Sequence, residues 1–166
     1  MYTIYTQKYC GYCSKAKELM KEHNCEFMEI SLDHDDQARV LLKEQAAGKK
    51  TGVLDLTRGE LGSRGSAEIR DQEAAAAAKI LKLSVRENLA FKDGFFMNDE
   101  AHQLEVIRII RKYRPEIVLC NSIKDRHPDH AKGSELASVS CYLSGLQRIE
   151  TTLEGIPQKH WRPKQV

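Results

Sequence analysis

The chain has 166 residues, 30% of them charged and 41% hydrophobic, with a formal net charge of +2 at pH 7. This length is typical of one α/β domain, alone or with a small appendage, and it can bury a core without disulfides. The near-neutral, well-mixed charge argues against a nucleic-acid-binding surface, and no apolar run approaches a membrane span. Five cysteines form no disulfide-scaffold pattern and the N-terminus has no signal-peptide pattern, so we expect a cytoplasmic protein with reduced cysteines.

The first 45 residues carry a pair of cysteines between an expected strand and an expected helix. Residues 1–6 alternate β-branched and aromatic side chains, as strands do, and residues 14–20 are typical of a helix. Cys10 and Cys13 stand between them as a CxxC motif. Because the amide groups and dipole at a helix N-terminus stabilise a thiolate, Cys10 is a candidate nucleophile and Cys13 its resolving partner. The alternative is half of a zinc knuckle, for which the sequence contains no second CxxC.

This part of the chain resembles the opening half of a glutaredoxin. The likeness rests on residues 2–6, on the Cys10-Gly11-Tyr12-Cys13 motif, on a strand at residues 26–30 and on a helix at residues 36–44. It implies thiol–disulfide exchange through Cys10 and Cys13, with a low-molecular-weight thiol as the partner. The proline segment that completes the glutathione groove in that family is missing, since the only prolines are at positions 115, 128, 157 and 163.

The rest of the chain alternates strand and helix patterns. Apolar runs predict strands at residues 51–56, 85–89 and 117–120, and the helical period predicts helices at residues 69–81, 104–113 and 129–146. This alternation indicates parallel strands joined by helical crossovers, in a three-layer, Rossmann-like α/β architecture. Ser66 has the character of a helix N-cap, and Pro115 is expected to end the helix before it. Residues 149–166 are expected to be a polar tail, in which the packing of Trp161 stays open.

Two loops hold candidate substrate-binding residues. The glycine-rich loop at residues 57–66 contains Arg58 and Arg64, either of which is a candidate to contact an anionic group of a substrate. The alternative is a surface loop with solvated arginines. Asp93 precedes Gly94 in a turn and is a candidate to orient a sugar hydroxyl, with a plain Asp-Gly turn as the alternative.

A cluster of histidines and carboxylates follows the expected strand at residues 117–120. The segment is Asp125-Arg126-His127-Pro128-Asp129-His130, and Pro128 stiffens it by fixing one backbone torsion. In open α/β sheets, ligands bind at the carboxyl ends of the strands. Imidazole is a common zinc ligand that a neighbouring carboxylate can orient. The pattern therefore favours a ligand or metal site over its alternative, a polar surface loop that contains histidines.

Residues 46–166 resemble the LmbE/PIG-L deacetylases, in particular their bacillithiol-pathway type. The likeness rests on residues 54–62, 70–74, 93–94 and 126–130, in this order. It implies a zinc-dependent enzyme that hydrolyses the acetamide of an N-acetylglucosamine conjugate. It also implies that His130 is a zinc ligand, that His127 steadies the oxyanion, and that Asp129 orients His127. Arg58, Arg64 and Asp93 become candidate substrate contacts.

One part of that family pattern is missing. The family opens with a strand that ends in Ala-His-Pro-Asp-Asp, which supplies two zinc ligands and the catalytic base. Here the acidic segment Asp33-His34-Asp35-Asp36 follows an expected strand instead. In a surrogate site, Asp36 and either Asp33 or His34 would join His130 as ligands, and Asp35 would be the base. The alternative is that these residues are only an acidic N-cap, because the helix dipole favours negative charge there.

These patterns together predict an α/β protein with a mostly parallel sheet. A glutaredoxin-like half-domain occupies residues 1–45 and a deacetylase-like segment residues 46–166, with one continuous sheet as an option. The preferred function is zinc-dependent N-deacetylation, impaired by the missing motif. A thiol–disulfide oxidoreductase and an inactive chimera remain alternatives. We expect a small-molecule partner, either an amino-sugar conjugate or a low-molecular-weight thiol, and neither nucleic acid nor membrane; self-association stays open.

Overall fold

The computed structural model describes residues 2–6, 11–31, 44–45 and 47–166. The chain divides into two compact units, Met1–Thr51 and Gly52–Val166. The boundary that we placed between residues 45 and 46 stays a prediction of where the two resemblances meet. Within the described residues no helix is long and apolar enough to cross a membrane.

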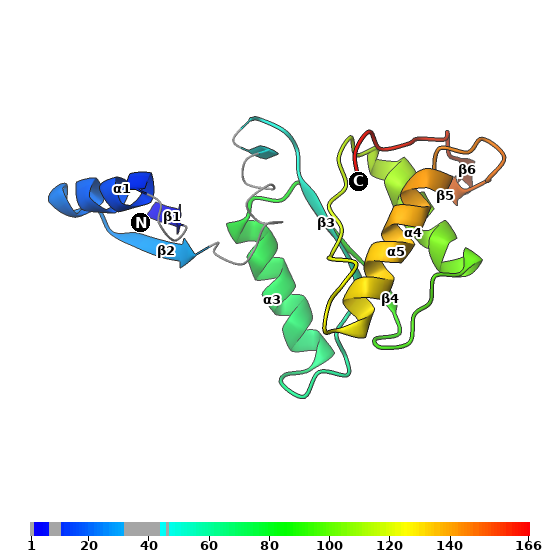
Figure 1. Ribbon diagram of the computed structural model, residues 1–166, viewed down its shortest axis with the longest axis horizontal. Coiled ribbons are helices and arrows are strands. Elements are labelled where there is room, and N and C mark those ends of the chain that lie inside the picture. The colour runs from blue at the N-terminus through cyan, green and yellow to red at the C-terminus, as the bar shows by residue number, and fades with distance from the viewer. Residues whose placement is uncertain (1, 7–10, 32–43, 46) are drawn as a thin grey trace. The chain divides into compact units, whose positions relative to one another are not determined.

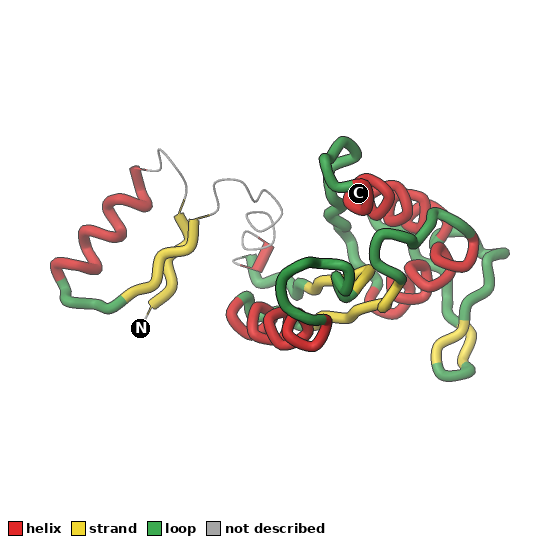
Figure 2. The backbone as a smooth tube through the Cα atoms, turned by 90° about the horizontal axis from the view of Figure 1, so that it is seen from below, coloured by secondary structure: helices red, strands yellow, loops and turns green. Residues whose placement is uncertain are grey.

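The first unit contains a parallel strand–helix–strand arrangement. Strand β1 (Tyr2–Thr6) and strand β2 (Phe27–Ser31) pair in parallel along their whole length, and helix α1 (Gly11–Glu22) connects them (Figures 1 and 2). This confirms the predicted order of elements. The helix expected at residues 36–44 lies outside the described residues, apart from its last position.

The second unit is built on two parallel strands. Strand β3 (Gly52–Thr57) pairs with strand β4 (Val85–Phe91), and helix α3 (Ala67–Ile80) makes the crossover between them. The register shifts between Asp55 and Thr57, where the ladder takes in one extra residue on β4. Ala90 has a positive φ of 51° at this irregularity, and its amide donates to the side chain of Asn88 at 2.7 Å. A β-bulge bends its strand and increases the local twist.

Helices lie on both faces of this strand pair (Figure 1). Helix α3 contacts β4 on one face, while helices α4 (Glu100–Tyr113) and α5 (Pro128–Leu143) pack together on the other. The core lies between the strands and these two helices. A three-layer α/β arrangement is therefore confirmed in this unit, and its buried cluster consists of Phe96, Val106, Ile110, Leu136 and Cys141, with Leu54, Leu56, Leu89 and Phe91 packed against it.

Caps set the ends of the helices near the positions that the sequence predicts. Ser66 accepts a hydrogen bond from the amide of Ile69 at 3.3 Å, as its N-cap role requires. Helix α4 begins at Glu100, four residues before the predicted start, because Asp99 caps it through the amide of His102 at 3.0 Å. It ends at Tyr113, before a left-handed Arg114 and Pro115.

The strand predicted at residues 117–120 does not form, and that prediction was wrong. Ile117 makes one isolated parallel bridge to Gln165, and the amide of Val118 donates to the carbonyl oxygen of Gln165 at 3.0 Å. A strand needs a neighbour along several residues, and among the described residues this segment has one bridge partner. In the described residues, β1–β2, β3–β4 and β5–β6 are separate two-stranded sheets.

The C-terminal stretch is more structured than the polar tail that we predicted. A short antiparallel hairpin joins β5 (Thr152–Leu153) to β6 (Ile156–Pro157). Trp161 packs against the core, and its indole N–H donates to the carbonyl oxygen of Pro115 at 2.8 Å. The chain end is therefore tied to the segment that follows α4. Helix α5 ends at Leu143, three residues before the predicted end at residue 146.

Candidate functional site

The start of helix α5 brings Asp125, His127 and His130 together. Asp125 accepts the amide of His127 at 2.8 Å with one carboxylate oxygen, and its other oxygen lies 2.9 Å from Nδ1 of His130. The two imidazole rings stack, with centroids 4.8 Å apart and planes inclined by 22°. Hydrogen bonds from the His127 amide and the His130 ring lower the pKa of Asp125 below its ordinary value. The carboxylate is therefore ionised beside the two rings at neutral pH.

His127 is also the N-cap of α5, which Pro128 continues at the first helical position. Its Nδ1 atom accepts the backbone amide of Asp129 at 3.3 Å. A backbone N–H can only donate, so Nδ1 of His127 carries no proton in this arrangement. Local capping therefore decides how this ring is held.

Asp129 contacts other groups than those implied by the family resemblance. Its carboxylate accepts the amide of Gly94 at 2.6 Å and pairs with Lys132 at 2.7 Å, and the side chain is buried. Burial alone would raise its pKa, but the Lys132 ammonium and the Gly94 amide together hold the pKa of Asp129 below its ordinary value. The bonds of this carboxylate join α5 to the turn at residues 93–95. The backbone amide of Asp129, and not its carboxylate, is what bonds His127.

A pocket of about 530 Å³ opens beside the two histidines. Its walls come from the second half of β3, the glycine-rich loop, the turn after β4 and the start of α5. A Cβ atom added to Gly133 would lie 3.1 Å from Leu56, so α5 approaches β3 closely at the floor of the pocket. The polar residues that line it are Asp55, Thr57, Arg70, Asp93, Asn121, His127, Asp129 and His130.

Two loops at this pocket are joined by reciprocal hydrogen bonds. The amide of Leu61 donates to the carboxylate of Asp93 at 3.0 Å, and the amide of Asp93 donates to Glu60 at 2.8 Å. The second bond is the main reason why the pKa of Glu60 is lowered. Asp93 is thus more than a plain Asp-Gly turn residue, since it both holds the glycine-rich loop and lines the pocket.

The arginines of the glycine-rich loop differ from our expectation in their contacts. Arg58 pairs with Asp71 of α3, its Nε lying 3.1 Å from the carboxylate, and this pairing raises the pKa of Arg58. Arg64 is exposed, and its carbonyl oxygen accepts the guanidinium of Arg70 at 3.1 Å. Arg70, which the sequence showed only as part of a motif, lines the pocket and lies against Gly59 and Gly62.

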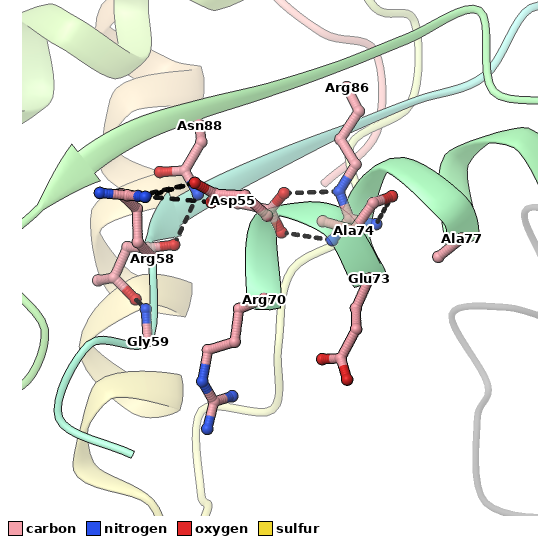
Figure 3. A pocket seen from close by; sticks show the side chains of 11 residues that line it. Asp55, Arg58, Gly59, Arg70, Glu73, Ala74, Ala77, Arg86 and Asn88 are labelled. Atoms are coloured by element: carbon pink, nitrogen blue, oxygen red, sulfur yellow. Dashed lines mark hydrogen bonds and ion pairs between the residues drawn. The ribbon is translucent and has the colours of Figure 1, made fainter. Parts of the chain in front are cut away.

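A second pocket of about 400 Å³ lies between the strand pair and α3. Figure 3 shows Arg86 reaching across to Asp55, with contacts of 2.6 and 2.9 Å, and donating also to the carbonyl oxygen of Ala74. Arg70 and Glu73 extend away from this pair in the same view. Asp55 and Arg86 neutralise each other in this pocket, so this pair offers no net charge to a ligand.

The described residues do not by themselves complete a metal site. Among residues 2–6, 11–31, 44–45 and 47–166, no three His, Cys, Asp or Glu side chains are grouped to hold a metal ion. Within this part His130 therefore does not belong to a set of three ligands, which is about the number of protein ligands that a catalytic zinc needs. The proposed donors Asp33, His34 and Asp36, the proposed base Asp35 and the nucleophile Cys10 all lie outside the described residues. Cys13 lies in the first turn of α1.

Sequence reasoning missed the roles of Asp125, Glu60 and Arg70. A signal for Asp125 did exist, because an Asp two residues before His127 can bond that amide as an Asx-turn. Glu60 pairs with a residue 33 positions away, which nothing local in the sequence announces. The partner of Arg70 is only 6 positions away, but a bond from its guanidinium to the carbonyl oxygen of Arg64 follows no turn or capping pattern.

Two protein families match along the chain. A family described as PIG-L, GlcNAc-PI de-N-acetylase, matches residues 35–141, and the glutaredoxin family matches residues 2–52. Two proteins of Synechocystis sp. named "probable glutaredoxin" are 40% and 38% identical to the chain over 48 residues. Those residues are 29% of this chain, and 44% and 54% of the two relatives.

Solved structures match a larger share of the chain. A conserved protein of Thermus thermophilus is 37% identical, with a TM-score of 0.69, over 77% of this chain and 56% of that one. The 4-carboxy-2-hydroxymuconate hydratase GalB of Pseudomonas putida is 25% identical, with a TM-score of 0.60, over 68% and 52%. N,N'-diacetylchitobiose deacetylase of Pyrococcus horikoshii, at 23% identity, a TM-score of 0.63 and coverage of 68% and 46%, shows a likeness of fold alone. The chain thus spans about half the length of the proteins that it matches.

Proposed function

Because the chain belongs to the PIG-L family, we propose that its second unit serves amide hydrolysis on an N-acetylglucosamine conjugate, of the kind used in bacillithiol synthesis. Membership alone does not decide the reaction, since a hydratase is among the similar structures and one fold can carry several chemistries. The proposal therefore has to rest on the pocket and on the residues that line it.

The observation that carries the proposal is the pair of stacked imidazoles at the edge of the 530 Å³ pocket. His127 accepts an amide at Nδ1, so in its neutral form its proton sits on Nε2. An N–H donor at this position suits the oxygen of an acetamide, on which negative charge develops when the carbonyl is attacked. Arg70 and Asp93 line the same pocket as candidate contacts to the sugar and its substituent.

We propose that zinc, if the protein uses it, is held by His130 together with donors from the segment Asp33–His34–Asp35–Asp36. The support is the family resemblance and the position of His130 at the edge of the 530 Å³ pocket. Because the described residues do not complete the ligand set, we derive no catalytic step through the metal. The test is the zinc content of the purified protein after dialysis. One equivalent that is lost in His130→Ala supports the proposal, and no bound zinc in the wild type ends it.

Hydrolysis is tested by the release of acetate from N-acetylglucosaminyl-malate and from other N-acetylglucosamine conjugates, with zinc supplied. If His127 stabilises the oxyanion, His127→Ala loses activity by about 10²- to 10³-fold, the usual effect of removing one such donor. Arg126→Ala is the matched control, because it changes the neighbouring exposed residue and should leave activity within about 3-fold. Equal activity of the wild type and His127→Ala would contradict the assignment of His127.

A second candidate function is thiol–disulfide exchange at Cys10 and Cys13. It is favoured by the glutaredoxin match over residues 2–52 and by the β1–α1–β2 arrangement, in which α1 begins directly after Cys10. A thiolate at a helix N-terminus stays reactive below the ordinary titration range of cysteine. Rapid labelling of Cys10 by iodoacetamide at about pH 6, abolished in Cys10→Ser, would support this function.

The two candidates and the inactive chimera are separated by the same two measurements. Zinc binding with acetate release supports the hydrolase. Acid-shifted labelling of Cys10, with reduction of a mixed disulfide substrate, supports the oxidoreductase. A protein that does neither is a chimera of two folds without the activity of either parent.

A further inference from the structure

His127 and His130 lie side by side, yet Nδ1 faces a hydrogen-bond donor in one ring and a carboxylate acceptor in the other. Nδ1 of His127 faces a group that can only donate, the amide of Asp129, at 3.3 Å. Nδ1 of His130 faces a group that, when ionised, can only accept, the carboxylate of Asp125, at 2.9 Å. The location of the proton on each neutral ring follows from these partners.

We infer that the two neutral imidazoles are held in opposite tautomers, His127 with its proton on Nε2 and His130 with its proton on Nδ1, and that Asp125 is the positioning residue for His130. The pocket that both rings line is then offered an N–H donor by one ring and a nitrogen lone pair by the other. A lone pair at Nε2 is what a ligand cation or a proton would meet.

The position of Asp125 is fixed by a second contact, because its other carboxylate oxygen accepts the amide of His127 at 2.8 Å. Since that amide holds the carboxylate in place, the oxygen that lies 2.9 Å from Nδ1 of His130 is a fixed acceptor. In water the neutral histidine side chain prefers the proton on Nε2, the ring nitrogen remote from the backbone, so the Nδ1–H form of His130 has to be imposed by its surroundings.

This inference rests on the proposed function only for its use of the pocket. It assigns the hydrogen-bond donor role to His127. It also identifies Asp125 as the aspartate that orients an imidazole, and His130 as the imidazole that is oriented. The family resemblance implied a different pairing, with Asp129 acting on His127. In the first pairing a substitution of Asp125 disturbs the ring of His130, and in the second a substitution of Asp129 disturbs the ring of His127.

The experiment is ¹⁵N-detected NMR of the imidazole nitrogens in the whole protein, at about pH 8.5, where imidazoles are neutral. The signals are assigned with His127→Gln and His130→Gln. We expect the Nδ1–H pattern for His130 and the Nε2–H pattern for His127. Asp125→Ala should convert His130 to the Nε2–H pattern and leave His127 unchanged. Arg126→Ala, in the same exposed loop, should change neither ring.

Asp129→Asn separates the two versions further, because it keeps the backbone amide that bonds His127. His127 should retain its Nε2–H pattern in this variant. An Nε2–H pattern for both rings in the wild type would overturn the inference, and so would an unchanged His130 signal in Asp125→Ala. None of these spectra requires zinc or turnover, so a protein without deacetylase activity can still pass or fail this test.

Discussion

At the residue scale, Arg111 is a buried charged side chain in the described part of the chain. The residue is only 3% exposed, and burial lowers the pKa of its guanidinium. It donates to the carbonyl oxygens of Ser144, Leu146 and Ile149 at 3.0, 2.9 and 2.7 Å, and to the hydroxyl of Thr151 at 2.9 Å. Five N–H donors in a rigid fork suit such a set of acceptors. Arg111 therefore holds the turn after α5 against α4.

Replacing Arg111 by Met should lower the free energy of unfolding by about 3 kcal/mol, because buried carbonyl groups would lose their donors. Arg108→Met is the matched control on the same helix, since Arg108 forms a half-exposed pair with Glu105, and should cost less than about 1 kcal/mol. Urea unfolding of both variants measures the difference. Equal losses would show that Arg111 contributes no more than a surface pair.

Cys141 gives a prediction for alkaline pH. Burial, helped by the nearby Cys120, raises the pKa of the Cys141 thiol from 9.0 to about 12. Between these values the unfolded thiol has lost its proton and the folded thiol has kept it, so the folded state binds more protons and stability falls as pH rises. The stability advantage of the wild type over Cys141→Ala should shrink between about pH 9 and 11 under reducing conditions. A constant difference over that range would contradict it.

The two histidines show how far sequence reasoning reaches at this scale. Their spacing placed His127 and His130 at the start of one helix, where the structure has them. The partner of each ring could not be predicted in the same way. The Asp129 carboxylate turns to Gly94, which is 35 positions away, and the choice between such a remote partner and a neighbouring ring depends on tertiary packing.

At the element scale, α3 and α4 are helices of 14 residues each that contribute very differently to the core. Helix α3 has no buried residue in the structure, and α4 buries Val106, Ile107, Ile110 and Arg111. Most of the stability of a protein helix comes from such packing and not from its intrinsic propensity. We therefore expect α4 to belong to the cooperative core of its unit and α3 to open more readily.

Removal of the N-caps tests this difference. Asp99→Ala should lower the free energy of global unfolding by about 1 kcal/mol, because α4 must form for the core to exist. Ser66→Ala should leave global stability nearly unchanged and should increase amide hydrogen exchange within α3 alone. Hydrogen exchange followed by mass spectrometry measures both effects. A larger global loss from Ser66→Ala would contradict the ranking.

The failed strand at residues 117–120 shows the limit of pattern reasoning for elements. Its apolar run is typical of a buried strand, and Val118 does pack against the core. A run of four apolar residues specifies burial but not a hydrogen-bonding neighbour. That neighbour is one residue of the chain end, Gln165, which no local pattern connects to position 117. The strands β3 and β4 were predictable because the helix between them gives the parallel crossover.

At the scale of the whole molecule, the described hydrophobic core belongs to one unit. Every member of the buried cluster lies between Gly52 and Val166. The alternation of strands and helices predicted this α/β layering, since each pattern has its own period. The relation between the two units could not be predicted, because each resembles a different family and no local pattern in one specifies a contact to the other.

The second unit should fold without the first. A fragment of residues 52–166 retains the whole described core, so we expect cooperative unfolding with a midpoint close to that of the full chain. Trp161 is the single tryptophan of the sequence and packs against this core, so its fluorescence reports on this unit in both proteins. Loss of a cooperative transition in the fragment would show that the first 51 residues are needed for it.

The two hydrogen bonds that join Glu60 and Leu61 to Asp93 have a consequence for how a ligand reaches the pocket. Each loop contributes one acceptor and one amide to the other, so neither can swing outward without breaking both contacts. We therefore expect the two loops to move together and not one by one. An insertion that lengthens one of these loops should therefore also loosen the other loop, and so change the rate at which a ligand enters the pocket.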